Sequence, residues 1–453
     1  MPGQPKAEFT PAASRALIGT GGLVALTFFT VSGGAYGLEP VVGSVGGRAA
    51  LLLLALVPLL WSLPIALMAA ELAAALPLLG GYYQWVRRAM GEFWGFQEGW
   101  WSWLFTWVDM PLYPLLCGAI LQQAWPSLSG GHALSRPAML AFVMAFIWAA
   151  ALLNWLGVKP VTEWAIVATI GVLAPFLAFL AAAWREPPRP APAHPHPLAW
   201  TGWALGLSTV MWNYAGWDNL ATFAPSVRQP GRSYPRALLA SVALVILAYV
   251  APVAAGLRLD PHRRHWQNGY FVHLAAIALG PWAAAVMFWT ALAAAWSQYT
   301  SQLLYVIPLP VSMAQDGYLP KLLTRSNRRG VATPALWLCT ALFSFFALIS
   351  FSNLVVADVM LYSAALALEF AALLALRRRQ PHLPRPFRVP LRGRALAAFS
   401  LVPLGLAAIA TLLAITQDRL AALGALALLA SGPLLLPMLR RRPAAAAATR
   451  SAP

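Results

Sequence analysis

Twelve long apolar runs occupy most of this 453-residue chain and constrain its fold more than any other feature. A helix needs about 20 consecutive apolar residues to cross the hydrocarbon core of a bilayer, and each run has about that length or more. We therefore predict an all-α polytopic membrane protein with twelve transmembrane helices. The runs are residues 17–38, 50–75, 93–124, 138–156, 161–184, 203–224, 237–257, 270–312, 335–352, 354–376, 395–416 and 420–439.

The charged residues agree with this prediction and indicate an orientation. Only 10% of the residues are charged, whereas a soluble domain averages about 25%. The chain has 31 Lys and Arg against 14 Asp and Glu, which gives a formal net charge of +17. All the basic residues lie outside the runs. With a cytoplasmic N-terminus most of them fall on the cytoplasmic side, as the positive-inside rule requires.

We interpret the basic clusters as topology signals that meet anionic lipid headgroups. Because no basic and aromatic motif lies in a folded soluble segment, we expect no nucleic-acid partner. The preference for Arg over Lys and the frequent Ala and Pro hint at a GC-rich bacterial genome. We expect the protein in the bacterial cytoplasmic (inner) membrane, with both termini in the cytoplasm.

The chain divides into four segments. Its first residues lack the layout of a signal peptide, so we interpret the first run as a retained span. We expect a cytoplasmic N-terminal tail at 1–16 and a ten-helix core at 17–377. A basic loop with the last two helices follows at 378–440, and a cytoplasmic tail occupies 441–453.

Cysteine and histidine give no sign of a metal site. Cys117 and Cys339 lie in separate apolar runs, and the seven histidines have no metal-ligand spacing. We expect no disulfide framework, no metal and no cofactor. An intramembrane enzyme would need a nucleophile and a base at membrane depth, and His273 is isolated near its span. We therefore do not expect an enzyme.

Apart from Glu163 at the start of the fifth run, six acidic residues fall inside the apolar runs. A charged side chain at mid-bilayer costs roughly 2.5–3.5 kcal/mol on insertion scales, so each is a candidate functional residue. Since no basic residue lies inside a run, we expect no ion pair with Arg or Lys. Protonation, a water-filled cavity, backbone hydrogen bonds or a cationic substrate remain as explanations. The six are Glu71, Glu98, Asp109, Asp218, Asp358 and Glu369.

The spacing of four of these acids indicates an elongated cation. Glu98 and Asp109 are eleven residues apart, about three helical turns or 16 Å, and therefore face nearly the same way. Trp101 and Phe105 share their stripe. Asp358 and Glu369 repeat the interval, with Tyr362 between them. Carboxylates can hold ammonium groups while aromatic faces line a methylene chain. The alternative is that the aromatic residues only pack or form an interfacial belt.

Two of the runs contain helix-breaking glycines. The first run contains FFTVSGGAYGLE at 28–39, and the sixth contains WNYAGWDN at 212–219. Glycine is about 1 kcal/mol worse than alanine in a helix interior. Transporters built from two inverted halves bind substrate where equivalent helices unwind, and the first and sixth helices are equivalent in a five-plus-five repeat. Close helix packing through small residues is the alternative.

At these residues the chain resembles a known family. The segments that carry the resemblance are VSGGAYGLE at 31–39, AELAAALPLLGGYYQW at 70–85, WGFQEGWWSWLFTWVDMPLYP at 94–114, NYAGWDN at 213–219, DGYLPK at 316–321 and LEFAALLALRRRQPHLPRPFRVPL at 368–391. They resemble the amino acid–polyamine–organocation transporter superfamily, and within it the polyamine:proton symporter branch of polyamine uptake transporters. The resemblance covers most of the chain.

The resemblance implies a LeuT-like core of ten helices in a five-plus-five inverted repeat, with broken first and sixth helices and two further helices. It implies that Ser32, Gly33 and Gly34 present backbone to the substrate and that Trp212 acts as an aromatic gate. Asp218 and Glu98 stand where related members keep acids. The chain departs from the pattern in three places. Ala35 stands where plant-type members usually have proline, and the eighth span keeps only part of the Ser-rich pattern. The third departure is in the fifth span. There the coupling lysine of some relatives is missing, and only Lys159 and Glu163 lie near its start.

We therefore predict a secondary active transporter for proton-coupled uptake of polyamines or related organic cations by alternating access. The alternatives are an amino acid permease or exchanger of the same superfamily, or a non-transporting sensor of the same fold. The expected partners are a small cationic or amino acid substrate, protons and membrane lipids. The candidate substrate-binding residues are Ser32, Gly33, Gly34, Tyr36, Glu98, Trp101, Trp212, Asn213, Tyr214, Asp218, Tyr299 and Tyr362. The candidate proton-coupling residues are Glu98, Asp218, Asp109 and Glu369.

Overall fold

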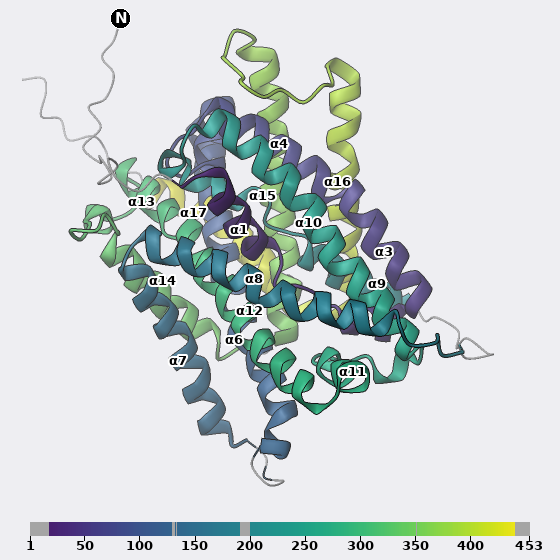
Figure 1. The fold of residues 1–453 in the computed structure, drawn as a ribbon. Helices are drawn as coiled ribbons and strands as arrows, with labels where there is room; N and C mark the ends of the chain where they lie inside the picture. Colours follow the sequence, from purple (N-terminus) through teal and green to yellow (C-terminus); the bar gives the residue numbers. More distant parts are fainter. Residues whose placement is uncertain (1–17, 129–131, 133, 191–199, 350, 440–453) are drawn as a thin grey trace, which may run out of the picture.

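The computed structural model describes residues 18–128, 132, 134–190, 200–349 and 351–439 (Figure 1). The predicted tails at 1–16 and 441–453 lie outside these residues. Within them the chain is helical, and its only β contacts are two isolated bridges, Ile18 with Val227 and Leu79 with Phe223. The helices are α1 (Thr20–Val31), α2 (Glu39–Val45), α3 (Gly47–Leu60), α4 (Ser62–Ala75), α5 (Tyr82–Met90), α6 (Glu92–Leu128), α7 (Arg136–Trp155), α8 (Val158–Ala183), α9 (Trp200–Asn213), α10 (Pro230–Leu259), α11 (Tyr270–Leu279), α12 (Pro281–Val306), α13 (Pro308–Gln315), α14 (Thr333–Phe346), α15 (Phe351–Arg379), α16 (Gly393–Gln417) and α17 (Arg419–Leu439).

The helices confirm an all-α polytopic membrane protein. Eight helical segments of the described chain are long and apolar enough to cross a membrane, and three shorter apolar helices accompany them. Large apolar side chains also face outward, among them Ile170, Leu247 and Leu434, which are 66%, 66% and 72% exposed. A soluble protein rarely exposes apolar patches on this scale, but a lipid-facing surface requires them. The number of crossings and the inverted repeat remain predictions.

The predicted breaks in the first and sixth runs are confirmed. Helix α1 ends at Val31, and the chain is non-helical until α2 begins at Glu39. Gly34 and Gly37 have φ values of 83° and 87° there, a region that side-chain-bearing residues rarely adopt. Helix α9 ends at Asn213, and a short 3₁₀ helix begins only at Asn219. Between them Gly216 has a φ of 92°.

Two other runs are also interrupted. The run at 50–75 divides at Trp61 into α3 and α4. Pro64 lies four residues after Leu60, and a proline ring clashes with the carbonyl four positions before it, which accounts for the interruption. The long run at 270–312 divides into α11, α12 and α13. The first division falls at Gly280, which has a φ of 92° and precedes a proline.

Long helices pack in pairs around the centre of the molecule. Helix α15 packs along α6, α4 packs along α10, and α1 lies among α8, α10 and α12. Helices α7 and α14 run side by side at one edge, and α3 and α10 run side by side at another (Figure 1). The last two helices, α16 and α17, both contact α15. This arrangement surrounds both the α1 break and the acid-bearing faces of α6 and α15 with other helices.

Candidate functional site

The buried acids gather in two clusters between α6 and α15. Glu98 of α6 and Glu369 of α15 lie close enough to Asp218 to interact electrostatically. Asp109 of α6 interacts in the same way with Asp358 of α15. The acid stripes of α6 and α15 therefore face each other, and the two helices run antiparallel. We call the first group the three-acid cluster (Glu98, Asp218, Glu369) and the second the two-acid cluster (Asp109, Asp358).

Neutral groups satisfy part of the three-acid cluster. Ser102 Oγ donates a hydrogen bond to Glu98 Oε1 at 2.9 Å. Tyr362 OH donates to Asp218 Oδ1 at 2.6 Å, and the Gly216 backbone N–H donates to the same hydroxyl at 3.2 Å. Tyr362 thus joins the break after α9 to α15. Oε2 of Glu98 and of Glu369 has no hydrogen-bond partner within the described chain.

The two-acid cluster has a similar set of donors. Tyr113 OH lies 3.2 Å from Asp109 Oδ1, and Trp212 Nε1 lies 3.4 Å from the same oxygen. Gln302 Oε1 accepts a hydrogen bond from Tyr305 OH at 2.7 Å. Gln302 Nε2 and Asp358 Oδ1 lack a hydrogen-bond partner among the residues that the structure describes. The cluster therefore combines unpaired donors and acceptors inside a buried region.

Aromatic side chains connect the two clusters. Phe105 and Tyr362 have ring centroids 5.2 Å apart, and they lie between the clusters along α6 and α15. Tyr305 interacts electrostatically with both Asp109 and Asp218, which places it between the clusters as well. Tyr82 of α5 interacts with all three members of the three-acid cluster. Aromatic rings therefore lie between the two clusters.

The break after α1 is held by local contacts and by α12. Gly34 N–H donates to Ser32 Oγ at 3.1 Å, and Tyr36 OH contacts Thr290 Oγ1 at 2.7 Å. A Cβ atom at Gly33 would lie 2.4 Å from Gln298 Oε1, so the Gln298 side chain covers this backbone. The predicted backbone site at 32–34 is therefore unwound and buried beneath α12.

Several predicted site residues lie away from both clusters. Trp101 Nε1 donates to the Leu429 carbonyl on α17 at 2.9 Å. Asn213 Nδ2 and Tyr214 OH donate to backbone carbonyls, those of Thr209 and Leu54. Tyr299 packs against Phe146 and Phe343 instead.

Sequence reasoning missed several residues that the structure brings to the clusters. Part of the signal was readable, since Ser102 and Tyr113 each follow an acid by four residues on the same helix and so lie on its face. Buried Glu39 was also missed. It accepts hydrogen bonds from the Gly37 and Gly269 N–H groups at 2.8 and 3.1 Å. The missed residues at the clusters are Tyr82, Ser102, Tyr113, Gln302 and Tyr305.

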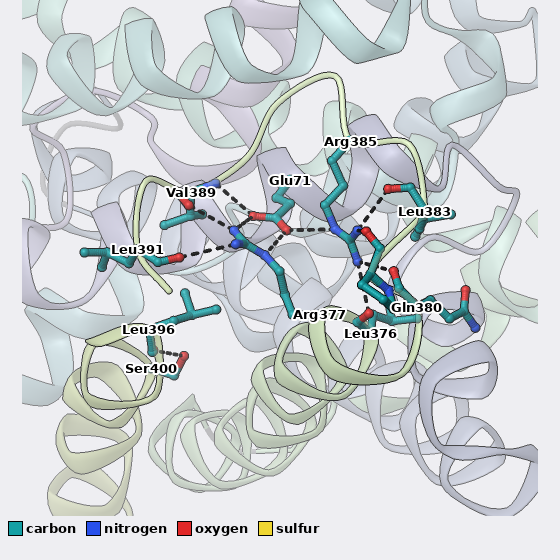
Figure 2. A network of polar contacts seen from close by, with 11 residues as sticks. Glu71, Leu376, Arg377, Gln380, Leu383, Arg385, Val389, Leu391, Leu396 and Ser400 are labelled. Atoms are coloured by element: carbon teal, nitrogen blue, oxygen red, sulfur yellow. Dashed lines mark hydrogen bonds and ion pairs between the residues drawn. The ribbon is translucent and has the colours of Figure 1, made fainter. Parts of the chain in front are cut away.

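The prediction that no buried acid has a basic partner is wrong for Glu71. Its carboxylate receives two hydrogen bonds from Arg377 at 2.6 and 2.5 Å, and Arg385 Nε lies 3.3 Å from it (Figure 2). The Val389 N–H also donates to it at 2.8 Å. Helix α15 continues beyond its apolar run to Arg379, and the following loop folds back over the end of α4. Arg377, which lies outside every apolar run, thereby reaches Glu71 inside the second run.

The other five buried acids differ from Glu71 in this respect. All are 0–3% exposed, and none forms an ion pair with any residue that the structure describes. Ionised carboxylates are costly to bury without a partner. A region with several of them accepts protons or attracts a cation, and it can exchange one for the other.

Comparison with known proteins finds permeases and transporters. A family model described as amino acid permease matches residues 15–429. Polyamine transporter PUT1 of Oryza sativa subsp. japonica is 34% identical over 92% of this chain and 77% of its own length. Polyamine transporter RMV1 of Arabidopsis thaliana is 30% identical over 92% of this chain and 84% of its own length. An uncharacterized transporter of Legionella pneumophila is 29% identical over 72% of this chain.

Proposed function

Because the chain belongs to the amino acid permease family of the amino acid–polyamine–organocation transporters, we propose that it takes up polyamines or related organic cations together with protons. The protein is a transporter, not an enzyme, and an integral membrane protein. The observation that carries the substrate proposal is the set of five buried acids without a basic partner.

The charge balance of the site favours a cationic substrate. A buried carboxylate needs a proton or a nearby positive charge, because desolvation penalises its ionised form. Ammonium groups of a polyamine would supply that charge, and the rings of Tyr362 and Phe105 would offer aromatic faces to its methylene segments. The names of the similar plant proteins, polyamine transporters, support the same substrate class.

Proton coupling would use the same carboxylates. We assign it to Glu98, Asp218, Asp109 and Glu369, which would take up protons when the cation leaves. The breaks after α1 and α9 provide the hinges for alternating access. Trp212 lies at the end of α9, directly before the second of these breaks, and contacts Asp109, so it is suited to cover bound substrate.

One observation favours an amino acid as the second candidate. The chain unwinds at 32–34, and in related folds the N–H groups of such an unwound segment bind a substrate carboxylate. The acid clusters argue against an amino acid without a cationic side chain, since they would face its carboxylate with like charge.

A substrate panel on the purified protein in proteoliposomes tests the proposal. Labelled spermidine should accumulate when the lumen is alkaline relative to the bath and should not accumulate without a gradient. Unlabelled putrescine and spermidine should compete, while arginine should compete weakly and neutral amino acids should not compete. Uptake of neutral amino acids without uptake of amines would contradict the proposed substrate class. Amine uptake that ignores the proton gradient would contradict the coupling.

A further inference from the structure

We propose that the three-acid and two-acid clusters form the two ends of one elongated site that selects polyamines by length. The proposal rests on the proposed function, that is, on cation transport through this region. It goes further in assigning both clusters to a single substrate molecule. Each end of a long polyamine would place an ammonium group against one cluster.

The helix geometry sets the distance between the clusters. Glu98 and Asp109 are eleven residues apart on α6, and α6 is helical over this whole interval. With a rise of 1.5 Å per residue, their Cα atoms are separated by about 16 Å along the axis. Glu369 and Asp358 on α15 repeat the same interval in the opposite direction. Two helices therefore give the same separation independently.

The contacts at each end indicate where a cation would bind. The acids are held by neutral donors, Tyr362 at Asp218 and Tyr113 at Asp109, which an ammonium group could replace without leaving a buried charge unpaired. Asp358 Oδ1 at one end and Glu98 Oε2 at the other have no hydrogen-bond partner in the described chain. The side chain of Gln302 interacts with Tyr113 beside the two-acid cluster. An unpaired buried polar group requires a partner, and under this proposal the substrate supplies it at both ends.

The stretch between the ends suits a hydrocarbon chain. Phe105, Tyr305 and Tyr362 line it, and all three are buried. No Lys or Arg forms an ion pair with any of the five acids within the described residues. A secondary ammonium in the middle of a polyamine could lie against the aromatic faces.

The separation favours long substrates. An extended chain advances about 1.1–1.2 Å per bond, so diaminobutane spans roughly 6 Å between its nitrogens and diaminododecane roughly 15 Å. Spermine, with the same number of bonds between its terminal nitrogens, also spans roughly 15 Å. A short diamine can engage one cluster at a time, whereas spermine and diaminododecane can engage both.

Competition against labelled spermidine uptake by a graded series tests this. The probes are diaminobutane, diaminooctane and diaminododecane, with the monoamines of equal chain length as controls for apolar contact. We expect diaminododecane to compete about tenfold or more better than diaminobutane, because a second charge-assisted contact forms. The gain should exceed the gain across the monoamines. Equal gains in both series would overturn the proposal.

Variants at one end sharpen the test. Asp358→Asn should reduce the ratio between the long and the short diamine to about threefold or less, and Asp358→Glu should restore it. This ratio is measured within one variant, so a loss of folded protein does not change it. Glu163→Gln removes an exposed acid on α8 and should leave the ratio as in wild type. An unchanged ratio in Asp358→Asn would overturn the two-ended site. If no amine competes at all, cation transport itself fails instead.

Discussion

Neutral hydroxyl and indole donors, rather than cations, contact three of the five buried carboxylates that lack a basic partner. Ser102 bonds to Glu98, Tyr362 to Asp218, and Tyr113 to Asp109. Such donors satisfy a carboxyl group in either protonation state, because a protonated carboxyl still has an acceptor oxygen. Under the proposed mechanism the acids would exchange a proton for a substrate ammonium group without the loss of a fixed ion pair.

The first prediction concerns two single acids of the three-acid cluster. Glu98→Gln and Asp218→Asn keep the side-chain shape but remove the charge that would meet the substrate. We expect each to reduce polyamine uptake in proteoliposomes by at least about tenfold, since a hydrogen bond to a charged group contributes roughly 1.5–3 kcal/mol. Membrane insertion, followed by extraction and gel filtration, should stay normal. Wild-type uptake in both variants would mean that these carboxylates are only structural.

The second prediction concerns the loop after α10. Burial raises the pKa of the Asp260 carboxyl, but hydrogen bonds from Tyr270, the His262 N–H and His265 outweigh burial and lower it to about 2. A carboxyl with a depressed native pKa stabilises the fold above its ordinary pKa of 3.8 and loses this contribution as the pH falls through about 2. Thermal unfolding of wild type and Asp260→Asn in detergent should differ at pH 5 and converge near pH 2. A difference independent of pH in this range would show that the charge has no role.

At the scale of elements, the loop after α15 connects the α4–α10 pair to the α6–α15 pair. Helix α4 packs along α10 and α15 along α6, and α4 and α15 touch only slightly. Glu71, Arg377 and Arg385 bridge them, and the guanidinium groups also hold the carbonyls of Val389, Leu391 and Leu383 (Figure 2). One buried carboxylate therefore orders the loop and fixes it to the end of α4.

The third prediction is that Glu71→Gln destabilises the protein strongly. The change leaves two buried arginines without their carboxylate, and breaking a buried ion pair from one side costs about 3–5 kcal/mol. The midpoint of thermal unfolding in detergent should fall accordingly. Glu71→Gln combined with Arg377→Met should recover part of the loss, because the second change removes one unpaired charge. A single variant as stable as wild type would contradict the structural role of this network.

At the scale of the whole molecule, the positions of the basic residues support our proposed orientation. We propose that both termini lie in the cytoplasm and that twelve crossings separate them. A ten-helix core at 17–377 would come first, and the last two helices with their loop at 378–440 would follow. The Arg-rich loop after α15 would then lie on the cytoplasmic side, and the loop after α8 on the opposite side.

The fourth prediction tests this orientation by cysteine labelling. The background replaces the two buried cysteines, Cys117 and Cys339, with alanine. His382→Cys, in the exposed loop after α15, should react with a membrane-impermeant maleimide only in inverted vesicles. Arg185→Cys, exposed after α8, should react only in intact cells. Reversed labelling would show that the orientation is opposite to the one proposed. Labelling of both sites from the same side would show that the number of crossings between them differs from the proposed number.

The sequence by itself determined the class of protein and much of its helix pattern. Long apolar runs must form helices in lipid, and Gly34 and Gly216, which both have positive φ, lie where two of these helices are interrupted. The acids of α6 and α15 could also be assigned to one face of each helix, because an interval of eleven residues is close to three turns. These are local properties, set by backbone geometry and by transfer from water to lipid.

Only the tertiary structure decided which acids meet. Glu98 lies near Glu369 rather than near Asp358 because α6 and α15 pack in opposite directions. Glu71 was assigned no basic partner because Arg377 lies outside every apolar run, yet the loop after α15 folds back to it. Trp101 shares a stripe with Glu98 but faces α17. Contacts between distant segments depend on how helices pack, and no spacing along one helix specifies them.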